Sequence, residues 1–505
     1  MLVRVRSSSV LGVSAVPVDV EVDVAGGMPR FVLVGLAGGA VQESVVRVAA
    51  AVRNLGFKLP SKRVTVNLAP ADLRKEGTAF DLPIAAALLG ACGLLPAASL
   101  AGLHLAGELS LSGEVKPTRG VLPMAIAARR SGARAFLVPP ANALEAAAVE
   151  GLLVRPVRHL GQLAGWAAGN QELDPVPPAD RQLPLTGGAL DLRDVAGQEG
   201  AKRALEIAAA GDHNLLLFGP PGSGKTMLAR RLGGLLPPLA LDEALEATSV
   251  HSVAGLLRDR GLLAERPFRA PHHSISDAGL VGGSNIPRPG EVSLAHHGVL
   301  FLDELPEFRR HVLDALRQPA EDGEVCIVRA ARAVRYPAQF MLVAAMNPCP
   351  CGWYGDPKRA CRCTLFELER YRRRISGPLL DRLDLHVDVP AVPPSALPGA
   401  GSAEASCAVR ERVLAARARQ GERRGRGGAR VNARLKGAAL RRSCPVDDAG
   451  RRLLTSAVEK LGLSARAHDR ILKVARTIAD LEGSESIRTA HLAEAVQYRA
   501  LDRRA

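Results

Sequence analysis

The feature that most constrains the fold is the stretch LLLFGPPGSGKTML, in which an apolar run leads into a glycine-rich loop and then a helix-forming segment. This order of strand, loop and helix is the context in which a P-loop binds phosphates. The glycines let backbone N–H groups approach the phosphates without Cβ clashes, and the start of the helix adds a favourable field. The motif predicts a nucleotide site formed by Gly219, Pro220, Pro221, Gly222, Ser223, Gly224, Lys225 and Thr226.

Three further positions complete the predicted ATPase site. In the P-loop, Lys225 offers a positive charge to the β- and γ-phosphates, and Thr226 offers its hydroxyl to Mg²⁺. The apolar run GVLFLDEL ends in Asp303, which is suited to hold Mg²⁺ through water, and Glu304, which is suited to polarise the attacking water. A third apolar run, QFMLVAAMN, ends in Asn347, a polar group that can reach the γ-phosphate or the water. ATP and Mg²⁺ are therefore the expected cofactors.

Arg382 is the residue predicted to act on the ATP of a neighbouring subunit. It follows a predicted helix in ISGPLLDRLDLHVDVP, where it could meet the neighbour's ATP as an arginine finger. The alternative is a local ion pair with Asp381 or Asp384.

Shifts in composition divide the chain into three parts joined by two linkers. Residues 1–170 alternate short β-type runs with Ala-rich helical stretches, and the Pro- and Gly-rich residues 171–190 predict a linker. Residues 191–390 alternate strands and helices, which predicts an α/β domain with a parallel sheet. A second linker, 391–404, leads into helices over 405–505.

The segments GPPGSGKT, FLDELPEF, AAMNPCPCG and RISGPLLDRLDL together resemble the AAA+ ATPases of the magnesium-chelatase-like ComM/YifB family. The most characteristic part of that pattern is Arg266 to Gly298, and the resemblance runs over essentially the full chain. It implies an AAA+ core with a helix-2 insert and a C-terminal helical lid, assembled as a homohexamer with ATP at the subunit interfaces. It also implies DNA binding and branch migration during natural transformation, with recombination proteins among the partners. By the same resemblance Arg466 occupies the sensor-2 position of the lid, and Arg470 is the alternative.

Two N-terminal segments, LRKEGTAFDLPIAAALLGA and GELSLSGEVKPTRGVLPMAIAA, resemble the signature segments of Lon-type proteolytic domains, which share a ribosomal-S5-like α/β fold. Ala79 stands at the position of the nucleophile and Leu122 at that of the lysine. Because neither side chain can act in covalent catalysis, the resemblance implies a non-catalytic domain used for assembly or DNA contact.

Four of the eight cysteines are crowded into NPCPCGWYGDPKRACRC as two CxC pairs. Thiolates at this spacing can converge on Zn²⁺, and the candidate ligands are Cys349, Cys351, Cys361 and Cys363. Two disulfides or free thiols are the alternatives. The other cysteines are scattered, which fits a reducing cytosol. Since the cluster lies between Asn347 and the arginine-rich segment ERYRRRISG, we hypothesise that this knob couples the nucleotide state to a basic surface.

A formal net charge of +15 favours an anionic polymer as partner, although solvated arginines are an alternative explanation. The segment GEVCIVRAARAVRYPAQF predicts a β-hairpin that turns near Ala330–Ala331 and presents Arg329, Arg332 and Arg335 to DNA phosphates. Ordinary surface charge is again the alternative. For His272 and His273, a structural or loop-contact role is favoured over metal binding.

The sequence also limits location and function class. The chain has no uninterrupted apolar run of membrane-spanning length, and its N-terminus lacks the apolar region of a signal peptide, so we expect a cytoplasmic protein. The favoured function is a DNA helicase or branch-migration motor. The alternatives are a chelatase-type or chaperone-type ATPase that remodels a protein partner and, with the dyad missing, an ATP-dependent protease.

Overall fold

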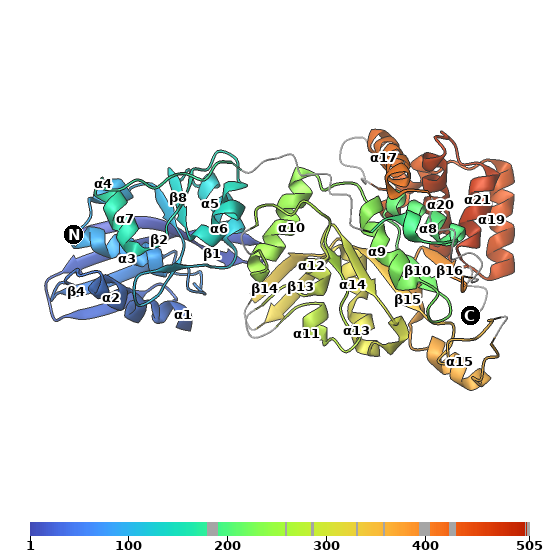
Figure 1. Cartoon of the computed structure of the whole chain (residues 1–505), viewed down its shortest axis with the longest axis horizontal. Coiled ribbons are helices and arrows are strands. Elements are labelled where there is room, and N and C mark those ends of the chain that lie inside the picture. Colours follow the sequence, from blue (N-terminus) through green and yellow to red (C-terminus); the bar gives the residue numbers. More distant parts are fainter. Residues whose placement is uncertain are drawn as a thin grey trace.

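The computed structural model describes residues 1–178, 190–257, 260–283, 287–329, 332–356, 359–392, 404–423, 431–499 and 501 of the 505-residue chain. Figure 1 shows a seven-stranded sheet with its helices at the N-terminal end, a parallel sheet with its helices in the middle, and a group of C-terminal helices packed beside the second sheet. None of the helices in these ranges is long and apolar enough to span a membrane.

The N-terminal sheet is mixed, with the strand order β3-β4-β2-β1-β5-β8-β9. Antiparallel β1 and β2 are joined by a two-residue turn in which Gly12 has a φ of 64°, a conformation that favours glycine. The strands are β1 Leu2–Leu11, β2 Ser14–Ala25, β3 Arg30–Val34, β4 Arg63–Ala69, β5 Leu103–Leu105, β8 Ala135–Val138 and β9 Val154–Pro156, beside the small hairpin of β6 Glu108–Leu109 and β7 Val115–Lys116.

Seven helices accompany this sheet. They are α1 Gly39–Gln42, α2 Ser44–Asn54, α3 Asp81–Ala91, α4 Ala97–Leu100, α5 Val121–Arg130, α6 Pro140–Ala147 and α7 Leu160–Ala167. Every residue of α3 is buried, as expected for a helix that is apolar on all sides. Its one carboxylate, Asp81, forms an ion pair with Arg47 of α2, with Oδ2 and Nε 2.6 Å apart.

The second sheet is parallel throughout, with the order β11-β12-β15-β10-β16. Its strands are β10 Leu215–Phe218, β11 Phe268–Arg269, β12 Val299–Leu302, β15 Met341–Met346 and β16 Leu385–Asp388. Apart from β11 and the last residue of β16, their side chains are buried, which explains why they form continuous apolar runs in the sequence. Parallel strands end at one edge, so the segments that follow β10, β12 and β15 lie together there.

Helices and one hairpin complete this part of the chain. The helices are α8 Glu199–Gly211, α9 Lys225–Leu235, α10 Leu241–Ala254, α11 Asp277–Leu280, α12 Glu291–Leu294, α13 Arg310–Ala315, α14 Arg317–Asp322, α15 Leu365–Arg372 and α16 Gly377–Leu380, with 3₁₀ turns at Leu192–Asp194 and Leu305–Glu307. The antiparallel hairpin consists of β13 Glu324–Arg329 and β14 Arg332–Pro337. The turn predicted at Ala330–Ala331 lies outside the described residues.

The C-terminal helices pack against α8 and α9 and share the hydrophobic core of the second sheet. They are α17 Ser406–Arg423, α18 Gly437–Ser443, α19 Asp448–Leu461, α20 Ala465–Leu481 and α21 Thr489–Gln497, with a 3₁₀ turn at Asn432–Arg434. Both α17 and α20 contact α8. A buried polar group joins them, because Asp480 of α20 accepts hydrogen bonds from Arg423, Asn432 and Arg476.

The N-terminal domain contacts the part of the chain that carries the P-loop through the end of α10. The backbone N–H of Gly120 donates to the carbonyl of Ser252 at 3.0 Å, and the Ser252 hydroxyl donates to buried Glu145 at 2.5 Å. Burial raises the pKa of Glu145. Leu122, which the sequence resemblance puts at the position of the Lon-type lysine, is fully buried, and its N–H donates to both Glu145 and Ser252. Ala79 is also buried. These two positions therefore serve packing in this chain.

Candidate nucleotide site and cysteine cluster

The P-loop connects β10 to α9 and has the backbone geometry of a phosphate-binding loop. Gly222 and Gly224 have φ angles of 76° and 95°, which L side chains rarely adopt. A Cβ on Gly219 would lie 2.1 Å from the carbonyl oxygen of Val389. These three positions require glycine for physical reasons, and the loop leads into the N-terminus of α9, where the first helical N–H groups can face an anion.

Lys225 is placed where phosphates would bind. Its ammonium donates to the carbonyls of Gly219 at 2.7 Å and Pro220 at 2.8 Å, and to the Asn347 side-chain oxygen at 3.2 Å. Burial lowers the pKa of this ammonium. The negative charge of an incoming phosphate would favour its protonated, charged form. The buried hydroxyl of Ser223 has no partner among the described residues. The loop therefore fits a phosphate group.

Thr226 and Asp303 meet across the site. The Thr226 hydroxyl donates to Asp303 Oδ2 at 2.7 Å, and the other Asp303 oxygen accepts the backbone N–H of Glu304 at 2.9 Å. A hydroxyl beside a carboxylate, next to the phosphate loop, is a ligand set that suits Mg²⁺. When bound there, Mg²⁺ would neutralise charge on the β- and γ-phosphates.

Glu304 follows β12 in the left-handed backbone region, with a φ of 52°. Its side chain is 57% exposed, and its carboxylate lies 3.4 Å from Nδ1 of His273. Glu304 is thus an exposed carboxylate next to Asp303, and its role in polarising a water molecule stays a prediction. The structure thus brings together five predicted residues: Lys225, Thr226, Asp303, Glu304 and Asn347.

Arg382 and Arg466 are not part of that group. Both line a cavity of about 670 Å³ that also includes Asn214, Phe340 and Asp384, the residues before β10, β15 and β16. The cavity thus opens at the amino ends of strands whose carboxyl ends carry the P-loop. Both arginines therefore lie at the edge of the sheet opposite the P-loop of their own chain.

The arginines in this cavity differ in their partners. Arg382 is mostly buried, donates to the carbonyl of Pro378 and forms an ion pair with Glu321. The local ion pair weighed from the sequence is therefore present, but its acid is Glu321 of α14 and neither Asp381 nor Asp384. Arg470 forms an ion pair with Asp384 at 3.0 Å. A hydrogen bond with His213, together with this ion pair, holds the pKa of the Asp384 carboxyl well below its usual range. Arg466 is exposed.

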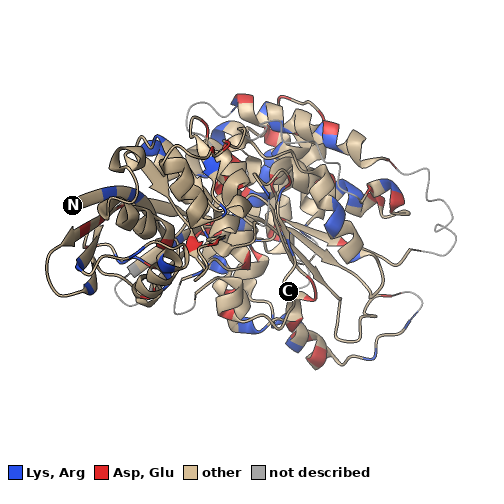
Figure 2. Cartoon of the chain, turned by 60° about the vertical axis from the view of Figure 1, so that its left-hand side comes forward, with Lys and Arg blue, Asp and Glu red and all other residues tan. Residues whose placement is uncertain are grey.

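The β13–β14 hairpin carries the three arginines predicted to contact DNA. Arg335 is 72% exposed and pairs with Glu324 on the neighbouring strand at 3.3 Å. Arg329 and Arg332 face each other as the last pair of the hairpin, and their side chains lie outside the described residues. In Figure 2, basic residues are interspersed with acidic ones over the chain, so the net positive charge does not by itself mark one binding surface.

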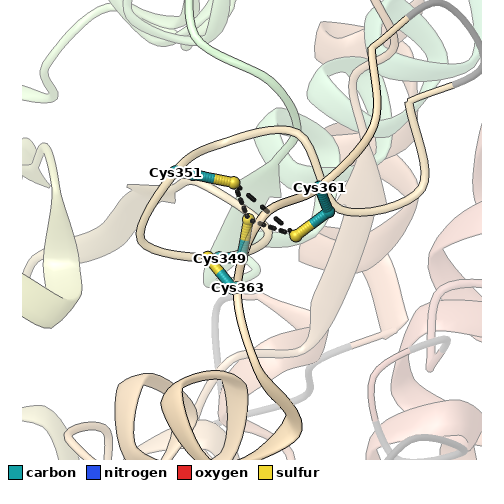
Figure 3. Close-up of side chains that lie close together, drawn as sticks. All are labelled: Cys349, Cys351, Cys361 and Cys363. Carbon is teal, nitrogen blue, oxygen red and sulfur yellow. Dashed lines mark hydrogen bonds between the residues drawn. The ribbon is translucent and has the colours of Figure 1, made fainter.

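The four clustered cysteines converge, as their spacing predicts (Figure 3). Cys349 Sγ lies 3.3 Å from Cys351 Sγ and 3.7 Å from Cys361 Sγ, and the latter two are 3.6 Å apart. All four sulfurs, Cys363 included, lie within 4.8 Å of one another. These distances are too long for disulfides, and the cysteines are free. A tetrahedral site with Zn–S bonds of about 2.3 Å has S···S edges of about 3.8 Å, which the observed separations approach.

The cysteine knob touches the P-loop directly. Gly352, between the two CxC pairs, has a φ of 85°, and a Cβ there would lie 2.6 Å from Cδ of Pro221. The guanidinium of Arg359 lies 4.3 Å from the ring centroid of Trp353 within the knob. The sequence placed the knob next to Asn347 but gave no sign of this contact with Pro221, because Gly352 and Pro221 are far apart along the chain.

Comparison with known proteins assigns a family. Three regions match families described as magnesium chelatase subunit ChlI (residues 191–397), subunit ChlI of Mg-chelatase (20–142) and the ChlI C-terminal region (403–499). The competence protein ComM of Haemophilus influenzae is 47% identical over 99% of this chain and 98% of its own length. The YifB protein of Salmonella typhimurium is 46% identical over 99% and 98%, respectively. The chain belongs to the ComM/YifB family of magnesium chelatase-like proteins.

Membership in the ComM/YifB family supports an ATPase-type activity that uses ATP and Mg²⁺. The name of the Haemophilus relative supports a function related to competence. Similarity to the 38 kDa magnesium-chelatase subunit of Rhodobacter capsulatus is narrower, at 31% identity over 30% of this chain and 49% of that protein. The ComM/YifB match covers the N-terminal domain and the cysteine knob as well as the ATPase part.

The structure brings together a second group of possible metal ligands, Glu246, His296 and His297, which the sequence did not predict. Nε2 of His296 and Nε2 of His297 lie 3.2 Å and 2.8 Å from the same oxygen of Glu246. However, His296 Nδ1 accepts the backbone N–H of Gln339 at 3.0 Å, so the neutral ring carries its proton on Nε2. That proton points toward Glu246, which makes this group a hydrogen-bonded cluster rather than a metal site.

We expect the purified protein to contain about one zinc ion per chain, because four sulfurs at this separation form one tetrahedral site. Elemental analysis of freshly reduced protein checks the value. Replacing Cys361 and Cys363 with serine should remove the zinc, whereas Cys407→Ser, an exposed cysteine outside the cluster, should retain it. Zinc-free wild-type protein would leave the free-thiol alternative.

Proposed function

We propose that this chain is an ATP-hydrolysing ring motor that acts on DNA, with helicase and branch-migration activity that supports integration of transforming DNA by homologous recombination. The observation that carries the proposal is the division of the catalytic set between two edges of one sheet. Lys225, Asp303 and Glu304 lie at the carboxyl ends of the strands, whereas Arg382 and Arg466 line a cavity at the amino ends. A complete site then requires two subunits.

This division supports a closed ring. A contact in which the carboxyl-end edge of one subunit meets the amino-end edge of the next is head-to-tail, and such contacts form rings when the rotation closes. In each interface Arg382 would stabilise charge on the neighbour's γ-phosphate during transfer, and Arg466 would add a second positive charge. Glu304 would polarise the water. Asn347, which accepts a hydrogen bond from Lys225, would contact the γ-phosphate or the water.

The DNA part of the proposal rests on near full-length similarity to a competence protein and on the arginine-bearing hairpin. The test is the rate of ATP hydrolysis without DNA and with single-stranded, forked and four-way DNA, measured together with strand displacement. We expect stimulation of hydrolysis and ATP-dependent displacement of at least one branched substrate. If all DNA forms leave hydrolysis unchanged and no strand is displaced, the DNA motor is excluded and remodelling of a protein partner becomes the better explanation.

We expect replacement of Arg329, Arg332 and Arg335 with alanine to weaken DNA binding equally across sequences, because phosphate contacts carry no sequence information. The slope of log affinity against log salt should flatten by roughly 0.7–0.9 per lost contact. Basal ATP hydrolysis should persist. The matched control replaces Arg441, Arg442 and Arg452, three exposed arginines of the C-terminal helices, and should keep the wild-type slope. Equal slopes for both variants would mean that the hairpin arginines do not contact DNA. Arg372–Arg374 would then be the next candidates for phosphate contacts.

A further inference from the structure

The cysteine knob and the helix α15 that follows it carry a concentration of aromatic and basic side chains. Aromatic residues make up only 3% of the chain, yet residues 349–374 contain four of them: Trp353, Tyr354, Phe366 and Tyr371. The same 26 residues contain seven Lys and Arg against three Asp and Glu. In Figure 1, α15 projects from the second sheet at the edge of the molecule. Basic residues interleaved with aromatic ones on a projection favour a nucleic acid as ligand.

Helix α15 has an inner and an outer side. Tyr371 and, just after the helix, Ile375 are buried in the core of the second sheet. On the outer side, Leu365 and Phe366 are 79% and 73% exposed. Adjacent large apolar side chains at this exposure are typical of a binding surface. Packing within the chain thus explains the inner residues but leaves Leu365 and Phe366 without a role.

The converged cysteines bring the aromatic side chains of the knob and of α15 together. The sulfurs of Cys351 and Cys363 lie within 4.8 Å of each other. Trp353 stands two residues after the first of these cysteines and Phe366 three residues after the second. Even fully extended, these connections span only about 7 Å and 11 Å. The two rings therefore belong to one small surface.

Guanidinium groups accompany the rings of the knob. The Arg359 guanidinium lies 4.3 Å from the ring centroid of Trp353, and that of Arg372 lies 5.5 Å from the ring centroid of Tyr354. Trp353 is partly exposed, and Tyr354 is exposed. A guanidinium beside a ring keeps N–H donors at its edge that can bind phosphate. Rings that can stack bases and cations that can bind phosphates are the combination used by proteins that bind single strands.

The charge of this surface selects among possible ligands. On the outer side, Arg373 pairs with Glu369 one turn earlier, whereas neither Arg362 nor Arg370 forms an ion pair within the part of the chain that the structure describes. Exposed cations without an acidic neighbour favour a polyanion. Among polyanions, a duplex keeps the faces of its bases stacked on one another, so exposed aromatic rings favour a single strand.

The surface is anchored beside the nucleotide site. Gly352 of the knob packs on Pro221 of the P-loop. At the end of α15, the Arg374 guanidinium donates to the carbonyl of Pro306 at 3.2 Å and pairs with Glu307 at 2.8 Å. Both of these acceptors lie in the 3₁₀ turn that follows β12. A strand bound to the outer side would therefore be attached to two of the loops that surround the nucleotide.

We propose that Trp353, Tyr354 and Phe366 form a platform on which the bases of single-stranded DNA stack. The phosphates are contacted by the arginines beside these rings, Arg359, Arg362 and Arg370. The platform accepts any sequence, since every base has a π-face. This inference rests on the proposed function and deepens it, because it adds a DNA site outside the β13–β14 hairpin and names the form of DNA that the site takes.

The test uses tryptophan fluorescence, because Trp353 is one of only two tryptophans and the other, Trp166, lies in α7 of the N-terminal domain. In full-length Trp166→Phe protein, oligothymidylate should quench the emission of Trp353 along the same titration curve as binding measured by fluorescence anisotropy. A blunt duplex of the same length should cause no quenching. In Trp353→Phe, which keeps an aromatic ring, the emission of Trp166 should stay constant.

Phe366→Ala should weaken the binding of oligothymidylate about five-fold or more, the loss expected when one base is no longer stacked. Because Phe366 is exposed, the fold should not depend on it. Phe366→Tyr retains a ring and should bind as the wild type does. Leu414→Ala replaces another exposed apolar residue, on α17, and is the matched control that should keep wild-type affinity.

Constant emission of Trp353 while anisotropy reports bound oligothymidylate would overturn the inference and leave the proposed function, with DNA contacted elsewhere. Equal quenching by oligothymidylate and duplex would also overturn it, since a duplex does not offer its base faces. If anisotropy detects no oligothymidylate binding, with or without a non-hydrolysable ATP analogue, the DNA motor and the inference fail together. Wild-type affinity in Phe366→Ala would remove Phe366 from the platform and contradict the proposal as stated.

Discussion

Replacement of Arg382 with alanine should lower steady-state ATP hydrolysis by about 10³-fold or more, the loss expected when an arginine finger is removed. Binding of ATP should be retained, because Arg382 lies in the cavity at the amino ends of the strands, away from the P-loop of its own chain. Turnover by a malachite-green or coupled assay and binding of a fluorescent ATP analogue measure the two quantities separately.

Mixed assemblies test whether Arg382 acts on the neighbouring subunit. Combining Arg382→Ala chains with Lys225→Ala chains should restore some activity, because the two defects can fall in one interface and leave others intact. The matched control is Glu321→Gln, which breaks the ion pair of Arg382 within the chain and should turn over normally. Loss of activity in Glu321→Gln, without recovery in any mixture, would mean that Arg382 acts through its local ion pair.

The elements around the P-loop could be predicted because their signals are local. Buried parallel strands form uninterrupted apolar runs, and the residues that end such runs in one sheet share an edge. Asp303, Asn347 and the P-loop therefore assemble as expected, as do the four cysteines, whose spacing alone lets them converge. The hairpin at Glu324–Pro337 also follows from its alternating sequence.

Contacts between distant segments could not be predicted from these patterns. The partner of Arg382 is Glu321, 61 residues away, whereas the sequence suggested only adjacent acids. Gly352 gives no sign that it packs on Pro221, and His273 gives none that it faces Glu304, since either contact depends on how loops fold over the sheet. Likewise, position in the sequence does not reveal that Arg466 and Arg470 share a cavity with Arg382.

Replacement of Glu304 with glutamine should slow ATP hydrolysis by about 10²- to 10³-fold, within the range attributed to general-base groups. The amide keeps the size of the side chain but is a poor acceptor for the water proton, whereas Thr226 and Asp303, the predicted Mg²⁺ ligands, keep their hydrogen bond. Nucleotide affinity and assembly should therefore be retained, so the variant should accumulate as an ATP-bound complex detectable by single-turnover kinetics.

Glu307→Gln, which alters a nearby half-exposed acid that pairs with Arg374, is the matched control and should hydrolyse ATP at close to the wild-type rate. Near-normal turnover by Glu304→Gln would transfer the role of polarising water to another group, and Asn347, hydrogen-bonded to Lys225, would then be tested first.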